Sequence, residues 1–173
     1  MTKNKEGSPL IIILSALLCF FLVRSFVADF KRIAGHSMQP AVQSGEFVLI
    51  NKLAYGLRLP FGDKYLVRWN SPVVGDIVYV RHPGEDKMII KRCLGTRGDK
   101  LLITPHFLVI HSRTIPAGDN NLLETLQFSA VPDDKLLIIG DNYANSIDSR
   151  TFGFVPESSV LGKVYSLESG FLH

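Results

Sequence analysis

The sequence predicts a mainly β protein, an antiparallel sheet or partly closed barrel, that follows one N-terminal transmembrane helix. An apolar run of membrane length lies near the N-terminus, and short apolar runs separated by Gly, Pro, Asn and Asp follow it. No long segment with the 3.6-residue period of an amphipathic helix occurs after the first run. The expected limits are a tail at 1–8, an anchor at 9–29 and a β domain at 30–173.

The apolar segment from Leu10 to Ala28 contains one charged residue, Arg24. As a helix it would be about 28 Å long, close to the thickness of a hydrocarbon core. A cleaved signal peptide is the competing interpretation, but no small-x-small cleavage site follows the run. We therefore expect a retained anchor. Basic residues flank both of its ends, so the positive-inside rule leaves its orientation open.

The rest of the chain is long enough to bury a core, and its apolar runs predict the strands. Turn residues bound each run on both sides. The predicted strands are 47–50, 77–80, 88–90, 101–103 and 136–139.

Composition excludes several functions. The net charge is +3, and Lys and Arg are scattered rather than clustered, which argues against nucleic-acid binding. The two cysteines, Cys19 and Cys93, lie in the anchor and in the β region, so no disulfide framework is expected. Neither an H-x-x-x-H nor a C-x-x-C pattern occurs, and we predict no metal site and no cofactor.

Ser37 and Lys91 are the candidate nucleophile and base. A serine hydroxyl needs a neighbouring base. None of the five histidines has a carboxylate at a sequence position that would suggest a catalytic pair. A lysine can take this role when burial lowers its pKa from about 10.4. Of the ten lysines, Lys91 has the most apolar surroundings. Taken alone, it also fits an outward-facing lysine of a surface strand.

A third polar block, 140–150, directly follows a predicted strand. It fits a loop of Asx turns with a surface pair between Asp148 and Arg150, and it fits a functional loop equally well. A calcium loop is a poor interpretation, because the EF-hand spacing and its closing glutamate are missing.

These blocks, in this order after one anchor, resemble the type I signal peptidases, a family of bacterial membrane-bound serine proteases. Residues 37–40 resemble the family's nucleophile box, 75–78 a structural strand box, 91–95 the lysine box and 140–150 the last box. The resemblance covers the chain from the anchor nearly to its C-terminus. It implies a β fold of the signal peptidase and LexA-like type.

The resemblance also implies roles for individual residues. Ser37 would attack the scissile carbonyl, and Lys91 would accept the proton of Ser37 and later activate the deacylating water. Ser146 would hydrogen-bond to the lysine and orient it, and Asp148 and Arg150 would form a supporting ion pair. The backbone N–H of Ser37 would donate to the oxyanion.

The implied substrates are secretory preproteins with signal peptides of the A-x-A type, which require shallow apolar pockets. Gly35 stands where some members carry a second hydroxyl, so the second oxyanion donor is left open. Residues near Ser37 and Lys91 are the expected pocket linings, and a core role explains each of them equally well. They are Ile33, Met38, Val42, Ile89 and Ile90.

The implied location is the bacterial cytoplasmic membrane, crossed once, with the catalytic domain on the outer side and in contact with lipid. One alternative is a specialised peptidase for a pilin or conjugation substrate. A LexA-like self-cleaving regulator would need a DNA-binding module where the anchor stands. A non-enzymatic anchored β domain that binds a protein partner would keep its function after substitution of Ser37 or Lys91.

Overall fold

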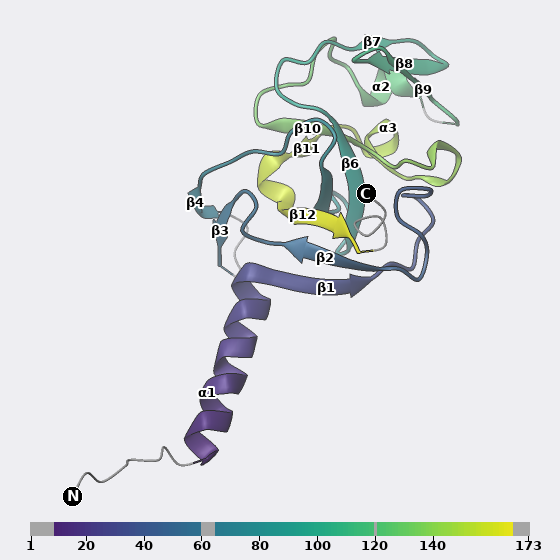
Figure 1. Ribbon diagram of the computed structural model, residues 1–173. Coiled ribbons are helices and arrows are strands. Elements are labelled where there is room, and N and C mark those ends of the chain that lie inside the picture. The colour runs from purple at the N-terminus through teal and green to yellow at the C-terminus, as the bar shows by residue number, and fades with distance from the viewer. Residues whose placement is uncertain (1–8, 60–64, 120, 168–173) are drawn as a thin grey trace, which may run out of the picture.

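The computed structural model describes residues 9–59, 65–119 and 121–167; the expected tail at 1–8 and residues 168–173 at the end of the expected β domain lie outside the described part. One helix leads into a curled antiparallel sheet, and a smaller lobe lies at the far end of that sheet (Figure 1). The predicted fold class, mainly β with one N-terminal apolar helix, is confirmed.

The N-terminal helix stands away from the body of the protein (Figure 1). Helix α1 (Pro9–Leu22) continues as a π-helical turn, Val23–Val27, and together they form a helix of 19 residues that is long and apolar enough to cross a membrane. None of its side chains is buried. The helix ends two residues before the expected limit at 29, because Ala28 and Asp29 already pair with the second strand.

The main sheet contains seven strands of the described chain, and each hydrogen-bonds to its neighbours in antiparallel fashion. The last strand in the sequence, β12, lies between β2 and β5. In spatial order, the strands are β1 (Ala28–Arg32), β2 (Phe47–Asn51), β12 (Val160–Ser166), β5 (Ile77–Arg81), β6 (Met88–Gly95), β10 (Lys135–Ile139) and β11 (Val155–Pro156).

Two smaller sheets flank the main one. A ribbon of β3 and β4 lies beside the upper end of the N-terminal helix, and a three-stranded sheet with α2 forms the far lobe (Figure 1). The short helix α3 follows the polar block after β10. These elements are β3 (Gly56–Arg58), β4 (Tyr65–Arg68), β7 (Leu102–Ile103), β8 (Phe107–Ile110), β9 (Arg113–Pro116), α2 (Leu122–Thr125) and α3 (Ser149–Phe152).

Three clusters of buried apolar side chains form the core, and the third lies under the residues that follow β1. Burial of one large apolar side chain stabilises a fold by about 1.5–3 kcal/mol. The residues directly after Ser37 belong to this cluster, so the core itself fixes that segment. The fully buried members are Met38, Val42, Val48, Ile50 and Val164.

Candidate active site

Ser37 lies in the connection between β1 and β2, between a buried side chain and a polar loop. The next residue, Met38, is only 2% exposed. The loop after β10 contacts the other side of Ser37. Asn142 donates its backbone N–H to the carbonyl of Ser37 at 3.0 Å and its side-chain amide to the carbonyl of His36 at 3.2 Å.

Gly140 allows this close approach. A Cβ atom at this position would collide with the carbonyl oxygen of Ser37 and with Oγ of Ser146. Only glycine therefore lets the loop after β10 pass directly over the serine segment.

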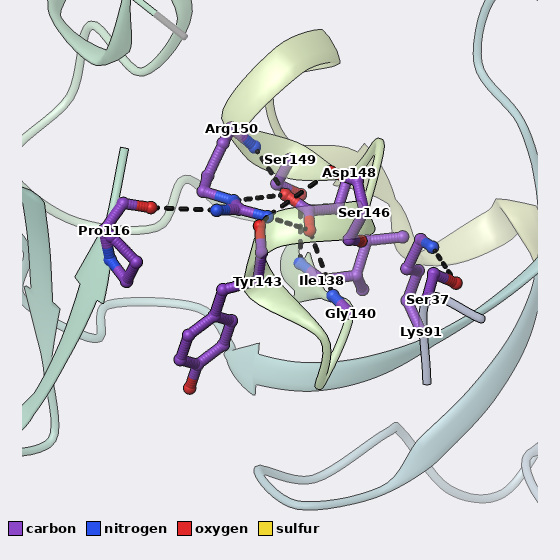
Figure 2. A network of polar contacts seen from close by, with 10 residues as sticks. All are labelled: Ser37, Lys91, Pro116, Ile138, Gly140, Tyr143, Ser146, Asp148, Ser149 and Arg150. Carbon is purple, nitrogen blue, oxygen red and sulfur yellow. Dashed lines mark hydrogen bonds and ion pairs between the residues drawn. The ribbon is translucent and has the colours of Figure 1, made fainter. Parts of the chain in front are cut away.

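Lys91 lies on β6, opposite Val78 of β5, and its side chain reaches Ser37. The amine donates to Ser37 Oγ at 2.7 Å, and the lysine is 3% exposed (Figure 2). Burial lowers the pKa of Lys91 to about 8; the charge of Asp148 acts in the opposite direction, and that of Arg150 lowers the pKa further. With that pKa, about one amine in ten is neutral at pH 7, against about one in a few thousand for an ordinary lysine.

Arg92, the next residue on β6, holds the same polar loop from outside. Its Nε and Nη2 donate to the two carboxylate oxygens of Asp141 at 2.7 and 2.5 Å, and its Nη1 donates to the carbonyl of Gly75 at 2.8 Å. No role was predicted from the sequence for the pair of Arg92 and Asp141, although Arg92 follows Lys91 on β6 and Asp141 precedes Asn142 in the loop.

Asp148 and Arg150 form a buried ion pair, not a surface pair. The two side chains are 0% and 1% exposed, and Nε and Nη2 of Arg150 each donate to an Asp148 oxygen at 2.9 Å (Figure 2). Asp148 also accepts the N–H of Gly140 at 3.0 Å. Arg150 donates further to the carbonyls of Pro116 at 2.8 Å and Tyr143 at 2.9 Å. The pair therefore ties the active-site loop to β9 in the far lobe.

Ser146 is the one expected supporting residue whose contact differs from the prediction. Its hydroxyl is buried and makes no hydrogen bond within the described residues, so the expected bond to Lys91 is not formed. The side chain instead lies against Gly140, whose backbone in turn lies against Ser37. Ser146 thus contacts the site through packing on the loop.

A cavity of about 330 Å³ opens beside Ser37 and Lys91. Four of the expected pocket residues line it: Ile33, Met38, Ile89 and Ile90. Val42 does not line the cavity; it is fully buried in the core, with no solvent-accessible surface. Its N–H donates to the carbonyl of Met38 at 3.0 Å, and this turn of the chain directs its side chain into the core rather than toward the cavity.

Sequence reasoning missed further residues that line this cavity, among them Tyr79 and Met88. Tyr79 pairs with Ile90 across β5 and β6, so strand pairing is the signal that would have found it. Gly35 also lines the cavity, and a Cβ built on it would have no atom within 4 Å. The wall next to Ser37 is therefore open at that position.

Within the described ranges, no group of three or more His, Cys, Asp or Glu side chains is placed to hold a metal ion. Cys19 and Cys93 are both free thiols, one exposed on α1 and one buried in β6. At the cavity, the Ser37 hydroxyl and the buried Lys91 amine are in hydrogen-bond contact.

The model of the family described as signal peptidase, peptidase S26 matches residues 8–167. The chain belongs to this family. It is therefore a peptidase and not a non-enzymatic β domain.

Signal peptidases of known sequence are similar to this peptidase over most of its length. Signal peptidase I of Buchnera aphidicola subsp. Baizongia pistaciae is 28% identical, with 86% of this chain and 72% of the relative covered. Probable signal peptidase I-1 of Synechocystis is 29% identical, with 91% and 79% covered. A crystal structure of a signal peptidase I from Enterococcus faecalis matches 56% of this chain and 98% of its own with 28% identity and a TM-score of 0.44.

Proposed function

We propose that the protein is a membrane-anchored serine endopeptidase that removes N-terminal signal peptides from secreted preproteins, with Ser37 as nucleophile and Lys91 as general base. The observation that carries this proposal is the 2.7 Å contact between the buried Lys91 amine and Ser37 Oγ. A neutral amine at hydrogen-bond distance is the arrangement that a serine needs to lose its proton during attack.

In the proposed mechanism, Ser37 Oγ attacks the scissile carbonyl carbon while its proton passes to Lys91 Nζ. The backbone N–H of Ser37 donates to the oxyanion that forms. The resulting ammonium of Lys91 returns the proton to the leaving amine, and an ester to the signal peptide remains on Ser37. The neutral amine then takes a proton from a water molecule while the water oxygen attacks the ester carbonyl; the ester bond breaks, and the Lys91 ammonium returns the proton to Ser37 Oγ.

The cavity beside the pair is the proposed site for the small side chains at positions −1 and −3 of the signal peptide. Ile33, Ile89 and Ile90 give it apolar walls, and the buried Met38 also lines it. Small residues of alanine size fit a shallow apolar site of this kind, whereas a large side chain would have to displace the surrounding walls. Val42 lies behind Met38 and takes no direct part.

The short stretch of chain between the apolar helix and Ser37 limits how far the serine can lie from the membrane. β1 begins at Ala28, directly after the apolar helix, and Ser37 follows only ten residues after the end of that helix. Ten extended residues span at most roughly 35 Å, so the serine stays near the membrane surface. We propose that the helix crosses the bacterial cytoplasmic membrane once and that the domain lies on the outer side, where signal peptides emerge from the bilayer.

The test of the proposed function is cleavage of a secretory precursor by the detergent-solubilised full chain. We expect wild type to release the signal peptide, and Ser37→Ala to release none, because no oxygen remains to form the acyl-enzyme. Ser71→Ala is the matched control, because Ser71 is exposed, and it should cleave at the wild-type rate. Equal rates for Ser37→Ala and wild type would refute the proposal.

The rate should depend on pH through Lys91. Because the pKa of this amine is lowered to about 8, the active neutral form increases as the pH rises. We expect log kcat/KM to rise by about one per pH unit below pH 8 and to level off above it. A rate that stays constant between pH 6 and 9 would contradict a lysine base.

A further inference from the structure

A second cavity continues from the first along β1 toward the C-terminal end of the N-terminal helix. Its volume is about 200 Å³. Lys31, Tyr79 and Met88 line both cavities, so the two form one groove. The far end reaches Ser25 and Phe26 in the last turn of the helix, which places it at the level where that helix ends.

The second cavity is lined by more cationic than acidic side chains. Among the described residues that line it, four are cationic and one is acidic. These are Lys31, Lys52, Arg58 and Arg81 against Asp29. The first cavity also has three cationic residues in its lining, Lys31, Arg32 and Lys91, and no acidic one, so positive charge exceeds negative charge along the whole groove and Lys31 belongs to both parts of it.

The amines of Lys52 and Lys31 in the second cavity are positioned by contacts with neighbouring groups. Lys52 donates to the carbonyl of Arg24 at 2.6 Å, which fixes its amine at the end of the helix. Burial lowers the pKa of Lys52, and the charges of Lys31 and Arg24 lower it further, while Asp29 raises it. Lys31 keeps 44% of its side chain exposed and lies 3.8 Å from Asp29. An added negative charge in the groove would therefore be attracted to both amines.

We propose that this second cavity binds the signal peptide a few residues upstream of the −3 position and favours acidic over basic side chains there. The proposal rests on the proposed function, because the occupant is the same substrate. An extended peptide advances about 3.3 Å per residue, as β1 does. Ile33 follows Asp29 by four residues, at the end of β1, so the second cavity lies beside roughly positions −5 to −7 of the substrate.

The experiment compares one precursor carrying Glu, Gln or Lys at each of positions −5, −6 and −7, cleaved by the full chain in zwitterionic detergent. For wild type we expect kcat/KM to fall in the order Glu, Gln, Lys at one or more of these positions. One partly exposed charge pair changes an equilibrium by up to about fivefold, so Glu and Lys should differ by about tenfold. The difference should shrink at high salt.

Lys31→Glu is the decisive variant, because it reverses the charge at the junction of the two cavities. We expect it to abolish or invert the order of the three precursors, and Lys31→Gln to give an intermediate result. Lys100→Glu makes the same change in net charge at an exposed site next to the far lobe, and it should keep the wild-type order.

The outcomes separate this inference from the proposed function. If wild type cleaves the precursors but ranks them equally, or if Lys31→Glu ranks them as wild type does, the inference is overturned and the proposed function stands. If wild type cleaves none of them, the proposed function fails. If vesicles with anionic lipid change the rates of all precursors alike and no charge order exists, the cavity binds lipid headgroups and the inference is also overturned.

Discussion

Lys91→Met is expected to lower the rate of precursor cleavage by about 10²–10⁴-fold, the contribution typical of a general base. Methionine has a similar length and keeps the apolar contacts of the lysine stem, but it cannot accept a proton from Ser37. The measurement is kcat/KM at pH 9, where the wild-type amine, with a pKa of about 8, is mostly neutral.

The stability of Lys91→Met gives an independent check that the amine, and not the fold, is responsible. The lowered pKa means that the folded protein binds this proton more weakly than the unfolded chain does. Between about pH 8 and 10.4 the unfolded state therefore binds more protons, and wild-type stability should rise with pH across that window. Below about pH 8, the Lys91→Met variant should unfold at a higher temperature than wild type. An inactive variant that unfolds at a lower temperature would point to a structural role instead.

Asp148→Asn is expected to destabilise the protein by about 3–5 kcal/mol, because it leaves the Arg150 charge buried without its partner. Both side chains are at most 1% exposed, so water cannot take the place of the carboxylate. The loss should also lower activity, since Asp148 holds the N–H of Gly140 next to Ser37. The measurement is urea unfolding of the solubilised chain, followed by circular dichroism.

The exposed ion pair between Arg97 and Asp133 provides the matched control. Their side chains are 72% and 73% exposed, and Asp133→Asn should change the free energy of unfolding by less than about 1 kcal/mol. The double variant Asp148→Asn with Arg150→Met should recover part of the lost stability, because it removes the unpaired charge. Equal effects of Asp148→Asn and Asp133→Asn would refute the structural role of the buried pair.

Local sequence was enough to predict several strands of the main sheet, but not the edge strand β1 or the internal strand β12. β2, β5 and β10 are apolar runs between turn residues, and each lies where it was predicted. β1 was missed because Ala28–Arg32 is mostly charged, as suits an edge strand facing solvent. β12 was missed because Gly162 and Lys163 interrupt its run of apolar residues, although burial alternates regularly along the strand.

The candidate site was predicted as a set of residues, and the structure brings Ser37 and Lys91 together. Spacing alone could not show this, since 54 residues separate them and their contact depends on the curl of a whole sheet. Asp and Arg side chains are mostly exposed in folded proteins. A surface location was therefore a reasonable expectation for Asp148 and Arg150. The missing bond from Ser146 depends on side-chain packing against Gly140, which no local pattern encodes.

The position of β12 has a consequence for the synthesis of the protein. Ser37 is carried by the β1–β2 side of the sheet and Lys91 by the β5–β6 side, and β12 is the strand that joins β2 to β5. A nascent chain on the ribosome that still lacks residues 160–166 lacks the strand that pairs with both β2 and β5. Backbone pairing between the two halves of the sheet therefore waits for a strand that is synthesised long after Ser37 and Lys91.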